Sequence, residues 1–300
     1  MELEYDADRE AQYHYDYFRE EYGYLYELAS QGDSDSQYDL GLFGVVGECG
    51  DAWVPPEWSD FINWFRLAAE QGHMKAQYEL GESYLRGVGI EKNLEEGIRW
   101  LCKSAEQDYD EAQFLLGECY DKGQGVPQDH NEAIKWYTKS ADQGFAKAQC
   151  KLGDIYVNGI GVEVDYAEGI EWLQTAAEQR NSEAKYLLGE CYDKGQGVPQ
   201  DHNEAIKWYK KSAGDQYKKA LCKLGRICIE SNGVVVNYEQ GVKYLQEAAR
   251  QKEAEAQFLL GQCYDKGQGV AQDHETAIEW YKEAADQGYK DAINILEQSE

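Results

Sequence analysis

The chain has 300 residues and is strongly acidic, with 57 aspartates and glutamates against 29 lysines and arginines, for a formal net charge of −28. This balance argues against binding nucleic acid, whose phosphates are held by clusters of lysine and arginine, and equally against docking on an anionic membrane. It favours a basic protein partner. The segment 1–60 holds more than a quarter of the acidic side chains and only two basic ones, Arg9 and Arg19.

Residues 1–31 form an acidic, tyrosine-rich segment in which residues 11–31 are expected to make a lone capping helix, with Tyr24 in the place of Trp64. A stripe at helical spacing should dock this helix on the first repeat: Phe18, Tyr22, Leu25 and Ala29. Tyrosine is frequent at binding hot spots and acidic groups attract basic proteins, so we predict contact residues at Tyr13, Tyr17 and Tyr24. A frayed acidic terminus is the alternative.

The first residues show neither the basic region nor the apolar region of a secretory signal. No later stretch approaches the roughly 18 uninterrupted apolar residues of a membrane-spanning helix. We therefore expect a cytoplasmic protein.

Residues 32–289 contain seven repeats marked by a Leu-Gly pair. The glycines recur at one constant spacing, except that the first interval is slightly longer: Gly41, Gly81, Gly117, Gly153, Gly189, Gly225 and Gly261. An aromatic residue follows three places later in most copies, and this spacing marks one face of a helix on which the glycine admits a close neighbour. Each repeat is predicted to be a helix, a loop, a second helix and a turn.

The loop that ends the first helix is rich in glycine, as at Gly123 and Gly125, where positive φ angles are expected. The second helix then opens on a capping pair three residues apart: Asn93 and Glu96, Asp129 and Glu132, Asp165 and Glu168, Asp201 and Glu204, Asn237 and Gln240, with Asp273 and Thr276 as the departure. One such hairpin cannot bury its apolar faces, but stacked hairpins share a core. Residues 290–300 should close the stack with a capping helix in which Glu297 replaces the glycine.

A second period, twice as long as the first, lies over it. Residues 117–141 and 189–213 are identical except for Thr138 against Lys210, whereas the repeats between them have a different form. Three tandem pairs of repeats are therefore predicted. Duplication is the first explanation for the identity between the copies, and function is the second.

The motif Ala-x3-Leu-Gly-x2-Tyr-x2-Gly-x-Gly-Val-x2-Asp-x3-Ala-x2-Trp-Tyr, written by residues 112–137, resembles the Sel-one-like repeat family, relatives of the tetratricopeptide repeats. The resemblance covers about residues 30–290. It implies an all-α fold: a right-handed α-solenoid of antiparallel helix pairs, a TPR-like superhelix with about 16 helices. It also implies an adaptor or assembly platform, and in bacteria a role in host interaction or toxin immunity.

The eight cysteines and the histidines do not suggest a disulfide or metal framework. No repeat has one cysteine in each of its two helices, and Cys222 and Cys228 point about 240° apart on one expected helix. Reduced, buried thiols are the favoured interpretation. The histidines His130, His202 and His274 are two repeats apart from one another and cannot converge on one ion, so surface histidines without metal are expected.

Known catalytic and nucleotide-binding motifs are missing, apart from Ser182 and Lys185, which form a Ser-x2-Lys pattern. Because some members of the family have been linked to penicillin binding, a cell-wall or β-lactam hydrolase is kept as the alternative function. The pattern is short enough to arise by chance, and no cofactor is predicted.

In stacks of this type the first helices line the concave face, and two of their positions should be exposed there. The first row is Tyr78, Phe114, Cys150, Tyr186, Cys222 and Phe258; the second is Glu82, Glu118, Asp154, Glu190, Arg226 and Gln262. Aromatic rings beside carboxylates suit lysine- or arginine-rich segments, although the aromatic row has core packing as an equal alternative. Arg226 and Gln262 break the acidic row, so the predicted partner-binding groove runs from the second repeat to the fifth.

The leading hypothesis is a bacterial, cytoplasmic interaction protein, not an enzyme, that binds or sequesters a basic protein partner. An immunity protein that neutralises a basic toxin is one form of it. An adaptor that holds two proteins on separate faces is a further hypothesis.

Overall fold

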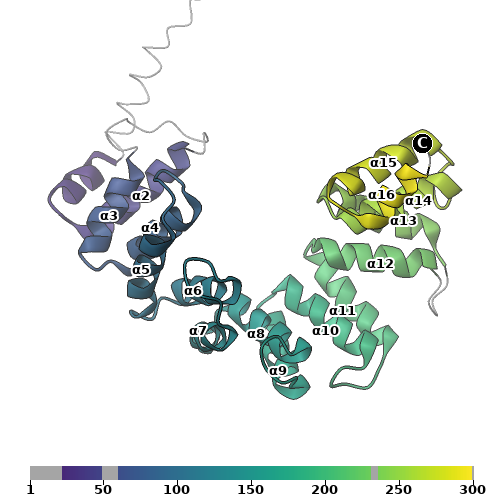
Figure 1. Cartoon of the computed structure of the whole chain (residues 1–300), viewed down its shortest axis with the longest axis horizontal. Helices are drawn as coiled ribbons and strands as arrows, with labels where there is room; N and C mark the ends of the chain where they lie inside the picture. Colours follow the sequence, from purple (N-terminus) through teal and green to yellow (C-terminus); the bar gives the residue numbers. More distant parts are fainter. Residues whose placement is uncertain (1–21, 49–59, 231–235, 299–300) are drawn as a thin grey trace, which may run out of the picture. The chain divides into compact units, whose positions relative to one another are not determined.

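The computed structural model describes residues 22–48, 60–230 and 236–298, and within them it contains helices and no strand (Figure 1). A helix over residues 22–30 precedes fifteen further helices in the described residues, which confirms the expected all-α fold with about 16 helices. No described helix has the length and apolar character needed to cross a bilayer.

The chain divides into two compact units, residues 1–148 and residues 149–300, and the division falls within α8 (Ala146–Asn158). Unit 1 contains α2 (Ser34–Glu48), α3 (Phe61–Glu70), α4 (Met74–Arg86), α5 (Leu94–Ala105), α6 (Asp110–Lys122) and α7 (His130–Asp142). Unit 2 contains α9 (Tyr166–Glu178), α10 (Ser182–Lys194), α11 (His202–Gly214), α12 (Lys218–Glu230), α13 (Tyr238–Arg250), α14 (Ala254–Lys266), α15 (His274–Asp286) and α16 (Lys290–Glu297).

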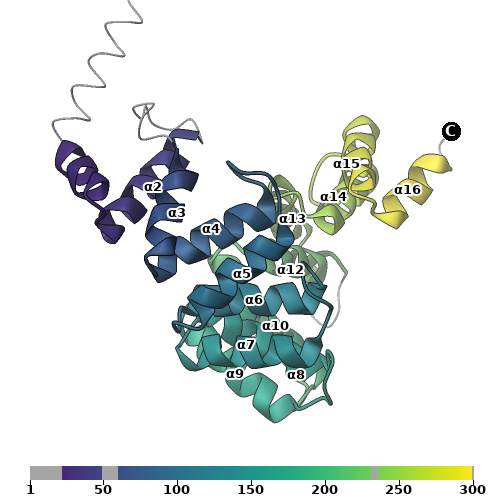
Figure 2. The same ribbon diagram turned by 60° about the vertical axis from the view of Figure 1, so that its left-hand side comes forward.

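Each unit is a stack of helix pairs. The two helices of a pair lie side by side, as α4 with α5 and α10 with α11, and within a unit a second helix also contacts the first helix of the next pair, as α5 with α6 and α13 with α14 (Figures 1 and 2). The last helix, α16, contacts α15 and follows the final pair. Within each unit, consecutive pairs therefore bury one another's apolar faces, as expected for a solenoid.

The repeated glycine lets the two helices of a pair approach closely. A Cβ atom built on Gly189 would lie 2.5 Å from Cε1 of Tyr209, and one built on Gly153 would lie 2.5 Å from Cγ of Leu173. The residue opposite the glycine alternates along the chain: it is leucine at 101, 173 and 245, and tyrosine at 137, 209 and 281. The doubled period of the sequence therefore corresponds to two alternating ways of packing the same helix pair.

Replacing Gly189 by alanine is expected to lower the free energy of unfolding by roughly 1–2 kcal/mol, because overpacking against a buried ring costs about 1–3 kcal/mol and the helical preference of alanine returns up to about 1 kcal/mol. Gly214 is the matched control, since it is also helical and a Cβ there meets no atom within 4 Å. Gly214→Ala should leave stability unchanged or raise it. Chemical denaturation followed by circular dichroism compares the two, and equal stability of both variants would contradict the packing argument.

The predicted caps and loops are present. Asn93 accepts a hydrogen bond from the backbone N–H of Glu96, Asp129 accepts one from Glu132, and Thr276 donates its hydroxyl to Asp273 at 2.7 Å. The loop glycine Gly123 adopts the left-handed conformation with φ 68°. The capping pairs and the positive φ predicted from the sequence are therefore confirmed, and both fix where each helix begins and ends.

Glutamine side chains connect the repeats through partly buried hydrogen bonds. In unit 1, Gln107, just after α5, donates to Gln77 of α4 at 2.7 Å, and Gln77 donates to the carbonyl of Ala69 in α3 at 3.0 Å. The pairs are 30 residues apart in the chain: Gln107 with Gln77, Gln143 with Gln113, Gln179 with Gln149, and Gln287 with Gln257. Because both amide groups are satisfied, these contacts let polar groups lie inside the stack at little cost.

Candidate protein-binding surfaces

The aromatic row packs between helices. The ring of Phe114 lies 5.6 Å from that of Tyr137 and 5.4 Å from that of Phe145, and Tyr186 contacts two rings in the same way. Tyr78, Phe114 and Tyr186 are half-buried, whereas Cys150, Cys222 and Phe258 are buried. The geometry favours the packing alternative for the row as a whole and leaves three of its rings partly accessible.

The carboxylate row is paired along its own helices. Glu82 forms an ion pair with Arg86 at 2.8 Å, Glu118 with Lys122 at 2.7 Å and Glu190 with Lys194 at 2.8 Å. Asp154 accepts a hydrogen bond from Asn158 at 2.7 Å. Each pair joins residues four apart, a contact worth only about 0.3–0.5 kcal/mol on an exposed helix. These contacts alone therefore leave the row open to a competing cation.

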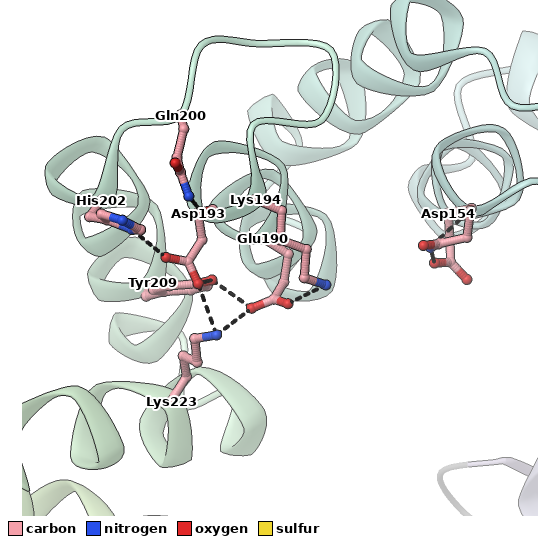
Figure 3. A network of polar contacts seen from close by, with 9 residues as sticks. Asp154, Glu190, Asp193, Lys194, Gln200, His202, Tyr209 and Lys223 are labelled. Atoms are coloured by element: carbon pink, nitrogen blue, oxygen red, sulfur yellow. Dashed lines mark hydrogen bonds and ion pairs between the residues drawn. The ribbon is translucent and has the colours of Figure 1, made fainter. Parts of the chain in front are cut away.

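Glu190 differs because a second helix neutralises it (Figure 3). The amine of Lys223 on α12 lies 3.0 Å from Oε1 of Glu190 and 3.0 Å from Oδ2 of Asp193, and the hydroxyl of Tyr209 donates to Glu190 at 2.6 Å. Burial acts to raise the pKa of Glu190, but the hydrogen bonds from Lys194, Tyr209 and Lys223 outweigh it and lower the pKa to about 2. Glu190 is thus ionised and fully engaged within unit 2.

A second group of acidic and aromatic side chains lies in unit 1. The carboxylate of Glu79 on α4 is half-buried and has no hydrogen bond or ion pair with any described residue. Burial raises its pKa to about 7, the charges of Glu82 and Glu111 raise it further, and the charge of Arg86, which is paired with Glu82, acts weakly in the opposite direction.

Three tyrosines surround these acids. Tyr38 feels the charge of Glu79, the rings of Tyr78 and Tyr109 meet edge to face at 5.5 Å, and the hydroxyl of Tyr109 donates to Glu111 at 2.8 Å. Burial, followed by the charge of Glu79, raises the pKa of Tyr38 to about 12. The unit 1 surface is defined here as Tyr38, Tyr78, Glu79, Glu82, Tyr109 and Glu111.

Sequence reasoning found Tyr78 and Glu82 of this surface and missed the other four residues. A signal for Glu79 was present, because the same position is leucine in three other repeats, at 115, 187 and 259. A carboxylate at a position that is leucine in three repeats and lysine in two others, at 151 and 223, is a better indicator of a special site than the acidic row that runs through several repeats.

The amino-terminal helix docks on the first repeat as predicted for its described part. Tyr22, Leu25 and Ala29 belong to a cluster with Leu40 and Trp64. Tyr24 is 74% exposed, whereas Trp64 is 8% exposed. The two residues occupy equivalent positions in the sequence pattern, but the tyrosine faces solvent and the tryptophan is buried. Phe18, Tyr13 and Tyr17 lie outside the described residues, as do residues 49–59 between the two helices of the first repeat.

The histidines hold short polar contacts at the starts of second helices. His130, His202 and His274 lie 2.9, 2.8 and 2.7 Å from an aspartate nine residues earlier, and their side chains are 38%, 62% and 68% exposed. Among the described residues no group of three or more histidine, cysteine, aspartate or glutamate side chains could hold a metal ion.

The seven described cysteines are free thiols, and five of them are buried. Burial raises the pKa of the Cys119 thiol to about 12 and that of Cys191 to about 11. These groups are protonated near neutral pH and pack as small apolar side chains. Cys49 lies outside the described residues.

The Ser-x2-Lys pattern has a structural explanation. Lys185 and Asp215 occupy the positions that hold paired glutamines in the preceding repeats, and the Lys185 amine lies 2.5 Å from Oδ2 of Asp215. The backbone carbonyl of Ser182 accepts a hydrogen bond from Ser212 at 2.6 Å. Lys185 therefore replaces a glutamine contact by an ion pair between α10 and the end of α11.

Because the pair stands in for a glutamine contact, the double variant Lys185→Gln/Asp215→Gln is expected to unfold within about 0.5 kcal/mol of the parent. Lys185→Ala should cost roughly 0.5–1 kcal/mol, since it removes the ion pair but leaves the carboxylate of Asp215 38% exposed to water. Denaturation curves test both. A double variant that is as unstable as the single one would show that the ion pair is not interchangeable with the glutamine pair.

Comparisons with known proteins place the chain in a family. The model of the Sel1 repeat matches seven stretches, residues 62–73, 75–109, 110–145, 146–181, 182–214, 218–253 and 254–289. A search of curated proteins returned no match.

Solved structures agree with this assignment. A protective antigen of uropathogenic Escherichia coli with an SLR fold is 33% identical over 90% of this chain, with a TM-score of 0.74; the chain spans 57% of that protein's length. A Sel1 repeat protein from Oxalobacter formigenes is 32% identical over 74% of this chain and 94% of its own, with a TM-score of 0.70. An immunity protein from Pseudomonas aeruginosa shares the fold at 19% identity, over 71% of this chain and 81% of its own, with a TM-score of 0.51.

The family matches cover most of the chain, and they coincide with the helix pairs of both units. The resemblance predicted from the sequence is thereby confirmed. The chain belongs to the Sel1 repeat family, whose members typically serve as scaffolds for protein interactions.

Proposed function

We propose that this protein is a non-enzymatic scaffold and that the unit 1 surface binds a basic segment of a partner protein. The observation that carries the proposal is Glu79, a half-buried carboxylate without a cation paired to it among the described residues, close enough to two other acids to feel their charge. Such a group destabilises the fold, and a bound ammonium or guanidinium would remove that penalty. The chain thus keeps an unfavourable charge at a position where three other repeats have leucine.

The tyrosines of the surface fit the same ligand. Aromatic faces attract lysine and arginine side chains, and Tyr38, Tyr78 and Tyr109 lie around the acids. Phe114 and Glu118 on α6 can extend the contact along unit 1. We do not extend it to Glu190, which Lys223 already neutralises. Contacts at Asp154, Tyr186, Tyr13, Tyr17 and Tyr24 stay predictions.

The test is binding of a fluorescein-labelled peptide of alternating lysine and glycine to the full chain, followed by anisotropy at about 150 mM salt, where distant charges are screened beyond about 8 Å. Glu79→Gln should weaken binding about tenfold, because one close charge pair is lost. Glu91→Gln is the matched control: it removes the same charge from an exposed loop of unit 1. If both variants lose the same affinity, binding depends only on the net charge of the protein, and the proposal is wrong.

An immunity role is one form of this function. The immunity protein from Pseudomonas aeruginosa supports the shared fold alone, at 19% identity, and the acidic charge of the chain is what would suit a basic toxin. Co-purification from the native host with mass spectrometry identifies the partner. An acidic partner bound to unit 1 with salt-independent affinity would contradict the electrostatic account. The bacterial origin and cytoplasmic location stay predictions.

A hydrolase is not proposed. Sel1 repeat proteins are generally non-enzymatic, and the amine of Lys185 is engaged with Asp215. Absence of β-lactam hydrolysis by the purified chain would agree with a scaffold, whereas activity that is lost in Ser182→Ala would overturn it.

A further inference from the structure

The tyrosine and acid at the centre of the unit 1 surface occur a second time, one repeat earlier. Tyr78 and Glu79 precede the Leu-Gly pair of α4, and Tyr38 and Asp39 precede that of α2 in the same way. The second of these two positions is leucine or lysine in the other five repeats. An acid at this repeat position is therefore confined to two consecutive first helices of unit 1.

A cavity of about 550 Å³ adjoins the earlier pair. Side chains of α2 and of the first residues around the start of α4 form most of its lining: Asp35, Tyr38, Asp39, His73, Met74 and Lys75. Ligand sites in proteins have volumes of about 300–1,000 Å³, so the cavity has room for a long side chain. Tyr38 belongs both to this cavity and to the unit 1 surface, and it feels the charges of Glu79 and Asp39. The cavity is thus continuous with that surface.

Asp39 is a carboxylate of this cavity without a partner. It makes no hydrogen bond or ion pair with any residue that the structure describes. Partial desolvation and the charge of Asp35 raise its pKa, whereas Lys75 and a protonated His73 act in the opposite direction. The charge of Asp39 is therefore left for a group from outside unit 1 to pair with.

The remaining charged groups of the lining leave the cavity acidic. Asp35 is 84% exposed, and Nε2 of His73 lies 3.2 Å from its Oδ1. Nδ1 of His73 accepts a hydrogen bond from the backbone N–H of Ala76 at 3.1 Å, so the ring in this geometry carries its proton on Nε2 and is neutral. Lys75 is the one lysine or arginine in the lining; it is exposed and has no ion pair with a described residue. Two carboxylates thus face one cation whose side chain is free to extend into water.

We propose that this cavity takes a second cationic side chain of the same partner segment, so that the segment carries one basic residue for Glu79 and another for Asp39. The inference rests on the proposed function, because the first cation is the one bound at the unit 1 surface. Neighbouring helices in a stack lie roughly 10 Å apart and an extended chain advances about 3.3 Å per residue, so two basic residues about three positions apart reach both helices. Tyr38 lies between the two acids and offers an aromatic ring to either cation.

The experiment uses two unlabelled glycine peptides of equal length, one with a single lysine and one with two lysines separated by two glycines. Each displaces the fluorescein-labelled peptide of alternating lysine and glycine from the full chain at about 150 mM salt. The second lysine should tighten binding about fivefold, of which a factor of about two arises because either lysine can occupy the site at Glu79. Asp39→Asn should reduce the gain to that factor. Asp142→Asn is the matched control, since it removes the same charge from the exposed end of α7 and should leave the gain unchanged.

Lys75→Ala is a second variant, with the opposite expected sign. Removing the cation that competes for Asp39 should increase the gain from the second lysine about twofold further, without changing the affinity of the peptide with one lysine. Lys92→Ala, in the exposed loop between α4 and α5, is its control and should alter neither value. An unchanged gain in Lys75→Ala would contradict the position of the second lysine beside Lys75.

The same measurements separate this inference from the proposed function. Glu79→Gln should weaken both peptides by the same factor, because each places a lysine at that carboxylate. If Glu79→Gln weakens both peptides but Asp39→Asn keeps the full gain, the cavity takes no cation; this inference is then wrong and the proposed function stands. If Asp39→Asn and Asp142→Asn reduce the gain equally, net charge explains it and the inference is wrong. If neither peptide displaces the probe, both the inference and the proposed function are wrong.

Discussion

Lys223→Ala is expected to lower the free energy of unfolding by about 3 kcal/mol at neutral pH, because removing one partner of a buried ion pair costs about 3–5 kcal/mol and this site is partly open. The side chains of Lys223, Glu190 and Asp193 are only 23%, 16% and 23% exposed. Without the lysine, two carboxylates on α10 lie close together with no shared cation. Denaturant unfolding followed by circular dichroism measures the change.

The loss of stability in Lys223→Ala should become smaller as the pH falls. The pKa of Glu190 falls from its ordinary 4.5 to about 2 in the folded chain. A carboxyl group with a lowered pKa stabilises the fold above pH 4.5, and that stability disappears as the pH falls through 4.5 towards 2. The difference between Lys223→Ala and the parent should therefore shrink over this range.

Lys207→Ala is the matched control for this variant. Lys207 is 67% exposed and pairs with Glu204 on its own helix, so its loss should leave the free energy of unfolding close to that of the parent. A Lys223→Ala protein as stable as the control would show that Glu190 and Asp193 are solvated well enough to need no partner.

Local signals predicted the fold well. The helix boundaries follow from capping residues such as Asp129 and from loop glycines such as Gly123. Each of these residues starts or ends a helix through contacts with residues close to it in the sequence. The close contact at Gly189 was also predictable, since a small residue repeated at a fixed period has a packing reason. These inferences needed only the periodicity and short-range chemistry.

The sites were less predictable, because charge partners come from other repeats. Glu190 looked like a free member of an acidic row, but its partner Lys223 sits on α12, the first helix of the next repeat. The Ser-x2-Lys pattern suggested a catalytic pair. In the structure, Lys185 instead forms an ion pair with Asp215, and these two residues are as far apart in the sequence as the two glutamines of each pair. Whether a charge is satisfied depends on the stacking of helices, which a single repeat does not contain.

One repeat position holds both of the charges with the largest expected effects. Glu79 on α4 and Lys223 on α12 occupy the place that is leucine on α6, α10 and α14 and lysine on α8. At this place Lys223 has two carboxylate partners within unit 2, whereas Glu79 has none among the described residues of unit 1. A charge at the same repeat position therefore stabilises the fold at Lys223 and destabilises it at Glu79.

Glu79→Leu is accordingly expected to raise the free energy of unfolding by about 2 kcal/mol at pH 8, while it weakens binding of a basic peptide. The folded pKa of Glu79 is about 7, above its ordinary 4.5. Below pH 4.5 the group is protonated in both states and costs nothing; between pH 4.5 and 7 the unfolded chain is ionised while the folded chain is not, so stability falls across this range and levels off above pH 7. A shift of this size corresponds to about 3 kcal/mol in full, which partial solvation reduces.

The measurement is the difference in unfolding free energy between Glu79→Leu and the parent at pH 4.5 and at pH 8. It should grow with pH, and Glu91→Leu, the same substitution on an exposed loop, should stay within about 0.5 kcal/mol of the parent at both values. If Glu79→Leu gains stability and loses affinity, the charge of Glu79 is retained for binding. Replacing a residue that is retained for folding alone would lower both the stability and the affinity. If Glu79→Leu is destabilised at pH 8, the carboxylate has a structural role and the unit 1 surface loses its main support.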